Sequence, residues 1–312
     1  MKKKYILIFM LALIFVSCSA VIMSPNNNTE ITDPMDPSKP IDPPEPDYPP
    51  WTEIQPPLPV LDDDAIKYGI DISQEDNLIK EQIKIKLKEY RNDKGQYKVI
   101  FTGKPKDDYL VSASLTKLTL EVARDLSISE AIIDVSNVYF NERKIKSRMF
   151  RGGVSLGYFN LSFILPENII RVIEGNAFSF LNNYLREITI PDSVIGIDAA
   201  AFQLSEVLNK ITFSEKSKLE YIGELAFSYS TVKEIVIPDS VKSIGTQAFG
   251  YSPQLTTLTY LGTSPNNINY EQDVFLLSTK LTTLIVPNAI NEHDSTWKTF
   301  LGGKFTTVTK GL

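Results

Sequence analysis

One residue pattern recurs between Phe163 and Pro287, and its spacing constrains the fold more than any other feature of the chain. The segments 188–202 and 235–249 both begin Ile-x-Ile-Pro-Asp-Ser-Val and both end in Ala-Phe. Successive copies start 25, 23, 24, 23 and 26 residues apart, counted at Phe163, Ile188, Ile211, Ile235, Leu258 and Leu284. Self-similarity at such a period predicts a solenoid, in which each repeat is one turn that packs only on its neighbours.

Each repeat carries an apolar triplet of the form Leu-x-x-Ile-x-Ile, which predicts a short strand because side chains alternate along a strand and the outer members then point inward. An Ala-Phe pair follows (Val-Phe in the last repeat), with an isoleucine or, in the last repeat, a tyrosine five positions before each Phe. The phenylalanines are Phe178, Phe202, Phe227, Phe249 and Phe275, and their partners are Ile173, Ile197, Ile222, Ile244 and Tyr270. These partners are expected in a short turn that plugs the interior. The predicted fold class is an α/β repeat, a leucine-rich-repeat solenoid with one short strand per repeat.

The residue pattern of these repeats resembles that of the BspA-like branch of bacterial leucine-rich repeats. The usual pattern of that branch is Leu-x-x-Ile-x-Ile-Pro-x-Ser-Val-x-x-Ile-Gly-x-x-Ala-Phe. The match covers about residues 160 to 290, and Glu174 and Asp198 stand where the usual pattern has glycine. The resemblance implies a surface or secreted bacterial protein, with adhesion to host matrix proteins or to other bacteria as the class of function. It implies no shared catalytic residues and no named ligand.

The N-terminal segments predict export and anchoring. Residues 1–17 have a basic start and an apolar run, as in a secretory signal peptide. The run Phe15–Cys18 resembles a loose bacterial lipobox, which implies lipid attachment at Cys18; a plain signal peptide with an incidental cysteine is the alternative. Twelve of the 19 prolines lie between Ser24 and Val60, so residues 18–62 are predicted to be a lipidated N-terminus followed by a disordered, extended stalk.

Two caps are predicted at the ends of the solenoid. Residues 63–130 alternate helix (76–90, capped by Asp76 or Asn77), strand (97–102) and helix (114–126), and a strand over 131–135 follows, so 63–130 is expected to be an α/β N-terminal cap. The solenoid proper is placed at 131–290, with Phe150 marking a degenerate first repeat. Residues 291–312 break the period and carry new aromatic residues, Trp297 among them, as expected of a C-terminal cap.

Composition excludes several classes of function. A net charge of −6 gives no general attraction for nucleic acid. One cysteine and one histidine, His293, exclude a Cys/His metal cage. Ser114 and Lys117 have the spacing of Ser-x-x-Lys enzymes, but no companion motif is present and a helix cap explains them. We therefore expect no enzyme, no metal and no cofactor; an enzyme hidden in 65–130 is the alternative.

The outward residues of the predicted strands are the candidate partner-binding site. One strand per repeat at about 4.8 Å spacing gives an exposed ladder on the order of 25 Å long. The candidates are Arg186, Glu187, Thr189, Lys210, Thr212, Lys233, Glu234, Thr257, Thr259 and Thr283, beside Asn209, Val236, Thr256, Thr282 and Ile285. The alternative is that threonine is simply a good exposed strand residue and that the charges keep the sheet soluble.

The sequence therefore predicts a lipid-anchored surface protein that presents a solenoid to an extracellular protein, a host matrix protein being one such ligand. Its location is expected to be the cell surface, at the outer membrane rather than in the periplasm. The membrane is contacted only through the lipid, and the chain is a monomer. The rival reading is a structural or antigenic coat protein without a dedicated ligand.

Overall fold

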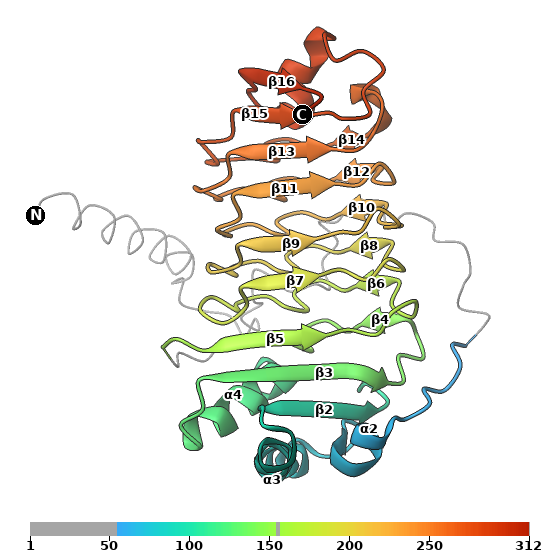
Figure 1. Cartoon of the computed structure of the whole chain (residues 1–312), viewed down its shortest axis with the longest axis vertical. Helices are drawn as coiled ribbons and strands as arrows, with labels where there is room; N and C mark the ends of the chain where they lie inside the picture. The colour runs from blue at the N-terminus through green and yellow to red at the C-terminus, as the bar shows by residue number, and fades with distance from the viewer. Residues whose placement is uncertain (1–54, 154–156, 312) are drawn as a thin grey trace, which may run out of the picture. The chain divides into compact units, whose positions relative to one another are not determined.

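The ladder of the predicted solenoid is present in a computed structural model, which describes residues 55–153 and 157–311. The signal peptide, Cys18 and most of the stalk lie outside these residues. Parallel strands follow one another up the solenoid in chain order (Figure 1). They are β5 (Asn160–Ile164), β7 (Glu187–Thr189), β9 (Lys210–Thr212), β11 (Glu234–Ile237), β13 (Thr257–Tyr260), β15 (Thr283–Ile285) and β16 (Thr307–Thr309).

Strand pairing along this ladder is parallel throughout. At two steps, from β5 to β7 and from β9 to β11, neighbouring turns are linked by fewer backbone contacts than at the others. β7 pairs with β9, and β11, β13, β15 and β16 form one sheet in that order. A single bridge between Leu161 and Leu185 links β5 to the turn before β7. A hydrogen bond from Thr231 N to Leu208 O (2.9 Å) links the turns that lead into β9 and β11. Each turn is therefore held to the next by backbone hydrogen bonds.

The apolar triplets fill the interior, as predicted. In the repeat around β11, Val232, Ile235 and Ile237 are 0–1% exposed. The equivalent residues of the repeats around β7, β9, β13 and β15 are also buried, except Phe213, which is half-buried like Phe163 on β5 and Val308 on β16. Burial of aliphatic side chains contributes about 25 cal/mol per Å² of apolar surface removed from water, so the repeated triplet is a large part of what holds the turns together.

The phenylalanines stack in a continuous column. Ring centroids lie 5.0 Å apart for Phe150 and Phe178, 4.9 Å for Phe178 and Phe202, and 5.1 Å for Phe202 and Phe227. The column continues to Phe249 at 5.6 Å and from there to Phe275 at 6.1 Å. The stacking of Phe150 confirms that it marks the first repeat.

A second parallel sheet runs along the solenoid where the sequence predicted only turns. Its six strands have two residues each, and every one carries an aliphatic plug residue or Tyr270 (Figure 1). They are β4 (Lys144–Ile145), β6 (Val172–Ile173), β8 (Gly196–Ile197), β10 (Tyr221–Ile222), β12 (Ser243–Ile244) and β14 (Asn269–Tyr270). Tyr270 does not plug the interior, because it lies in the edge strand and is 48% exposed.

The N-terminal unit contains more elements than the sequence predicted. Its sheet has the order β1-β2-β3-β5, so it leads directly into the ladder. Helix α3 starts after Glu75, which makes no side-chain capping bond, so the prediction of Asp76 or Asn77 as its cap was wrong. The elements are α2 (Asp63–Tyr68), β1 (Gly69–Asp71), α3 (Asp76–Lys94), β2 (Lys98–Gly103), η2 (Val111–Ala113), α4 (Leu115–Asp125) and β3 (Glu130–Val138).

At the other end, aromatic residues close the core. The short helices there are η3 (Pro265–Asn267) and η4 (Ser295–Gly302). Trp297 is fully buried, its ring centroid lies 6.1 Å from that of Tyr260, and its Nε1 donates to Asn291 O at 2.9 Å. Phe300 packs against both rings, so the last repeat does not expose its apolar interior at this point.

Candidate binding face

Three columns of outward side chains run along the ladder from β7 to β16, and we call them together the ladder face. The first column precedes each strand, the second begins it, and the third stands two residues further on. The columns are Arg186, Asn209, Lys233, Thr256, Thr282 and Thr306; Glu187, Lys210, Glu234, Thr257, Thr283 and Thr307; and Thr189, Thr212, Val236, Thr259, Ile285 and Thr309.

Burial alternates along each strand as the pleat requires. In β11, Glu234 and Val236 are exposed while Ile235 and Ile237 are buried. In β7, Glu187 and Thr189 are exposed on either side of buried Ile188. All ten candidate residues are exposed or half-buried, so the structure places each of them on the outward side. Their role in binding a partner stays a prediction.

The half of the ladder face around β7, β9 and β11 is charged, and its charges are unpaired. Within the described residues, Arg186, Glu187, Lys210, Lys233 and Glu234 form no ion pair with one another or with other side chains. This holds although Glu187 lies directly opposite Lys210 in the strand register. Charges that the described residues leave unneutralised remain available to steer and bind a charged partner.

The other half, around β13, β15 and β16, carries no charge in these columns and consists of eight threonines and Ile285. Some of the hydroxyls already have partners: Thr256 Oγ1 donates to Lys233 O (3.1 Å), and Thr306 Oγ1 lies 3.5 Å from Thr282 O. The hydroxyl of Thr257 lies 3.4 Å from that of Thr256, whereas the hydroxyl of Thr283 makes no hydrogen bond among the described residues and is the better placed for a partner.

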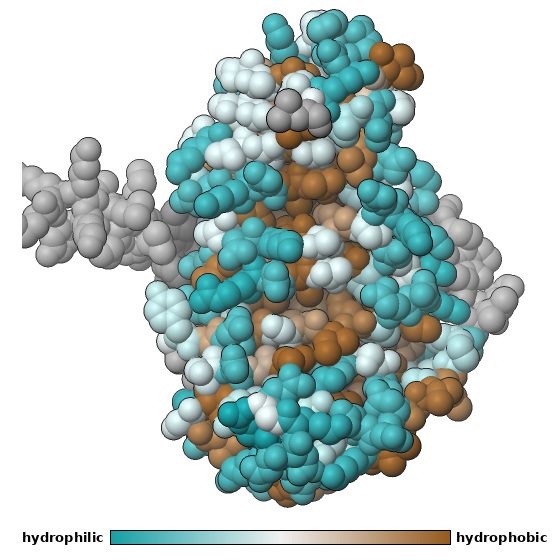
Figure 2. Space-filling view, viewed as in Figure 1, coloured by the Kyte–Doolittle hydropathy of each residue, from teal (hydrophilic) through white to brown (hydrophobic). Residues whose placement is uncertain are grey.

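Apolar surface is interspersed on the side of the molecule that carries the ladder. Figure 2 shows hydrophobic surface along the middle of the view that looks onto the ladder, with hydrophilic margins on both sides. Among outward residues of the strands, Ile164 on β5 is 39% exposed and Val236 on β11 is 37% exposed. Apolar surface with a polar rim is the usual anatomy of a protein–protein interface.

Strand β16 extends the ladder face, which the sequence analysis did not foresee. Thr307 pairs with Thr283 and Thr309 with Ile285, so the segment 304–308 continues the ladder and the prediction that it breaks the period was wrong. A signal was present: Phe305-x-x-Val308 repeats the triplet spacing, and Val308 follows Leu284 by 24 positions.

Residues considered for catalysis have structural roles where the chain is described. Ser114 caps α4, its Oγ accepting from Lys117 N (3.0 Å) and donating to Arg151 O (2.5 Å). The side chain of His293 is 88% exposed and lies 3.7 Å from Glu292. The described residues hold no cluster of three His, Cys, Asp or Glu side chains suited to a metal. The same residues include no helix of sufficient length and hydropathy to cross a bilayer.

The architecture and the residue pattern of the repeats together define the class of protein. A parallel solenoid with one inward triplet and one Ala-Phe pair per turn is a leucine-rich-repeat protein. Residues 171–297 match the family described as "BspA type Leucine rich repeat region", in six copies. This stretch of the chain is therefore a BspA-type leucine-rich-repeat region.

Solved structures with some likeness carry compatible descriptions. A leucine-rich repeat protein from Bacteroides ovatus ATCC 8483 is 18% identical, with a TM-score of 0.27 over 56% of this chain and 57% of its own. A leucine rich cell surface protein from Faecalibacterium prausnitzii A2-165 is 13% identical, with a TM-score of 0.26 over 61% of this chain and 82% of its own. A leucine-rich repeat protein from Eubacterium ventriosum ATCC 27560 is 16% identical, with a TM-score of 0.21 over 70% of this chain and 80% of its own. No curated protein matches the chain. At these scores only the repeat match supports the family.

Proposed function

We propose that this chain is a bacterial surface protein whose ladder face binds an extracellular protein, with adhesion to host matrix or to other cells as its purpose. The observation that carries the proposal is the set of five charges without an ion pair among the described residues, which lie beside the uncharged threonines on the exposed ladder face. Stacked repeats hold such a face rigid, and extended faces of this kind are what repeat proteins use for binding. The same fold argues for a binding scaffold rather than a catalyst.

The anchoring part of the proposal rests on the sequence alone. A lipid on Cys18 would tether the chain, and the proline-rich residues 18–62 would hold the solenoid away from the membrane, at the outer surface of the cell. We expect Cys18→Ser to move the protein from the membrane fraction to the soluble fraction. Protease added to intact cells should remove the solenoid; protection of the solenoid would contradict surface display.

Binding is tested with a substitution that leaves the fold intact. The variant Thr257→Lys, Thr259→Lys, Thr283→Lys places three charges on the uncharged half of the ladder face without changing its buried residues. We expect capture of the matrix proteins fibronectin, laminin or collagen by the native chain and its loss in this variant. Thr263→Lys, Thr279→Lys, Thr299→Lys, at exposed threonines outside the ladder face, should bind like the native chain.

The outcomes separate the proposal from its rival. Equal binding by both triple variants would contradict a role for the ladder face. Capture of none of the three matrix proteins and no adhesion to other cells would favour a structural or antigenic coat protein, for which the face need only be soluble.

A further inference from the structure

Helix α2 lies where the chain enters the folded body, and it is attached to that body in a different way from any repeat. It has six residues and is capped by Asp62, whose Oδ1 accepts from Ala65 N at 2.7 Å. Only Ala65 and Tyr68 of the helix are buried. Just ahead of it, Tyr139 Oη makes a long hydrogen bond to Gln55 Oε1 (3.4 Å).

The apolar contacts of α2 form a small cluster that is separate from the main core. This cluster contains Ala65, Tyr68, Tyr90 and Ile100 and nothing else. The rings of Tyr68 and Tyr90 meet edge to face, with centroids 4.9 Å apart at 72°. The main core begins immediately afterwards, at Ile70. The helix can therefore leave its place without opening the interior of the solenoid.

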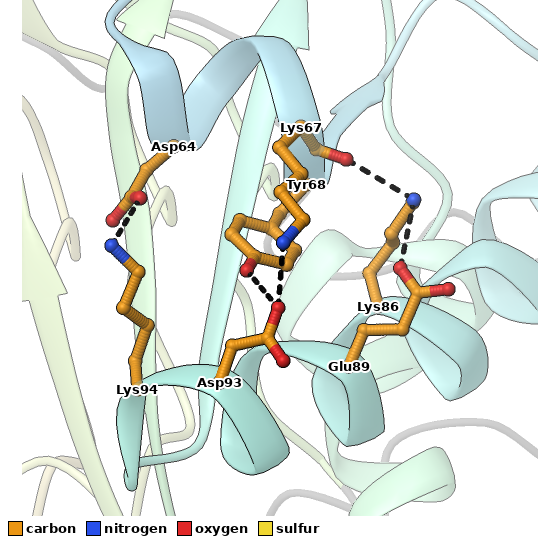
Figure 3. A network of polar contacts seen from close by, with 7 residues as sticks. All are labelled: Asp64, Lys67, Tyr68, Lys86, Glu89, Asp93 and Lys94. Carbon is orange, nitrogen blue, oxygen red and sulfur yellow. Dashed lines mark hydrogen bonds and ion pairs between the residues drawn. The ribbon is translucent and has the colours of Figure 1, made fainter.

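Two carboxylates hold α2 against α3. Asp93 of α3 accepts from Tyr68 Oη at 2.5 Å and pairs with Lys67 Nζ at 2.7 Å (Figure 3). Asp64 of α2 pairs with Lys94 Nζ at 2.8 Å and accepts from Tyr90 Oη at 2.9 Å.

A third contact joins the same two helices: Lys86 Nζ donates to Lys67 O at 3.2 Å and also pairs with Glu89 at 2.9 Å (Figure 3). The ion-paired side chains are largely solvent-accessible, 63% and 43% for Lys67 and Asp93. Exposed ion pairs contribute little to stability and weaken with salt. A segment held by such pairs and by four apolar residues belongs to the low-stability end of the molecule.

We propose that α2 is a releasable clasp: it docks on α3 through Asp64, Asp93 and the Tyr68–Tyr90 pair, and it undocks as a unit while the solenoid stays folded. The position of α2 at the N-terminal end of the folded body means that its release can absorb tension on the chain. A pull on the residues before Gln55 acts first on the Gln55–Tyr139 contact and on buried Pro56, and then on α2. Its release lengthens these six residues from about 1.5 Å to about 3.3 Å each, and the repeats are spared.

Gly69 is the hinge between clasp and core. A Cβ at this position would lie 2.2 Å from Ala65 O and 2.8 Å from Thr102 Cγ2. Only glycine therefore allows the last turn of α2 to sit this close to β1 and β2. Gly69→Ala should loosen the clasp, since the cheapest way to relieve the overlap is to displace α2.

Acid should open the clasp. Asp64 faces Lys94 and Tyr90 from α3 and Lys98 from β2, while Asp93 faces Lys67 and Tyr68 from α2 and Lys94 from its own helix. The hydrogen-bonded Lys94 lowers the pKa of Asp64, and Lys67 lowers the pKa of Asp93. Because both folded-state values are depressed, docking is fully supported above the ordinary aspartate pKa and is lost as pH falls through the depressed values.

Native-state hydrogen exchange of the full chain tests the clasp. In the native chain we expect the amides of α2 to exchange faster than those of β11 at pH 7. In Asp64→Asn, Asp93→Asn the exchange of α2 should rise about tenfold, the size expected for two surface pairs, with β11 unchanged. Lowering the pH stepwise below the ordinary aspartate pKa, after correction for the intrinsic rate, should have the same selective effect.

A matched control removes an ion pair elsewhere in the same unit. Glu121→Gln breaks the Lys80–Glu121 pair (2.6 Å) between α3 and α4 and should leave exchange in α2 unchanged. Equal protection of α2 and β11 in the native chain would overturn the proposal. So would an Asp64→Asn, Asp93→Asn variant that changes both segments alike, or neither.

Discussion

At the scale of single residues, the turns around each Phe depend on left-handed backbone. Among the described residues, fifteen non-glycine residues have positive φ, and eleven of these stand two positions before or after a stacked phenylalanine. They are Arg148, Asn176, Ala200, Leu225, Gln247 and Asp273 before it, and Phe180, Leu204, Tyr229, Tyr251 and Leu277 after it. Left-handed backbone costs roughly 1 kcal/mol at a non-glycine residue. Formation of the stacked phenylalanine core therefore has to outweigh the conformational free-energy cost of left-handed backbone in each repeat.

A glycine at one of these positions should stabilise the protein. Gln247 has φ of 54° and a half-buried side chain. We expect Gln247→Gly to raise the free energy of unfolding by about 0.5–1 kcal/mol, because relief of the strain exceeds the added freedom of the unfolded chain. Urea unfolding measures it. Gln272→Gly, at an exposed residue without positive φ, should destabilise; a loss of stability at both sites would contradict the strain.

At the scale of elements, the second sheet is held by the stacking of turns on one another. Glu174 N donates to Ile145 O (3.0 Å), and Gly223 N donates to Ile197 O (2.7 Å). A Cβ on Gly223 would lie 2.6 Å from Ala199 N and 2.7 Å from the carbonyl carbon of Asp198. Two turns thus approach as closely as backbone allows at this point.

Substituting that glycine tests the close approach. Gly223→Ala should lower the free energy of unfolding by about 1–3 kcal/mol, as overpacking does when the obstructing atoms are backbone. Gly175→Ala meets one atom at 3.0 Å, Ala199 O, and should cost less. Both are measured by urea unfolding; an equal cost for the two would show that the contact distance does not set the effect.

The elements also show which parts of the fold the sequence could predict. Triplets and Ala-Phe pairs recur at fixed spacing, so the ladder, the inward side chains and the Phe150 stack were predictable. Two-residue strands such as Ser243–Ile244 have no periodicity of their own and exist only because their neighbours stack on them. Helix α2 and strand β1 are likewise too short to leave a pattern.

The sequence could predict which side chains of the candidate site point outward, but it could not predict whether their charges are paired. Alternation alone placed Glu187 and Thr257 on the outward side. That the charges of the ladder face are unpaired depends on the side chains around them, and no spacing in the sequence reveals it. Thr307 and Thr309 joined the face because β16 pairs with β15.

At the scale of the molecule, one hydrophobic core extends from Ile70 to Phe305, so the N-terminal α/β unit, the repeats and the closing aromatic cluster share an interior. The cluster around α2 is the part of the described core that stands apart. A shared core predicts that the ladder face behaves as one rigid surface. Such a surface binds with little cost in conformational entropy.

The central claim is that this rigid face binds a protein through its unpaired charges, and a matched pair of charge reversals tests it most directly. Arg186→Glu, Lys233→Glu alters the ladder face, while Lys84→Glu, Lys88→Glu makes the same change in net charge on exposed α3. We predict that association with the captured matrix protein at low salt slows at least tenfold in the first variant only. Equal association rates for both variants and the native chain would contradict the account.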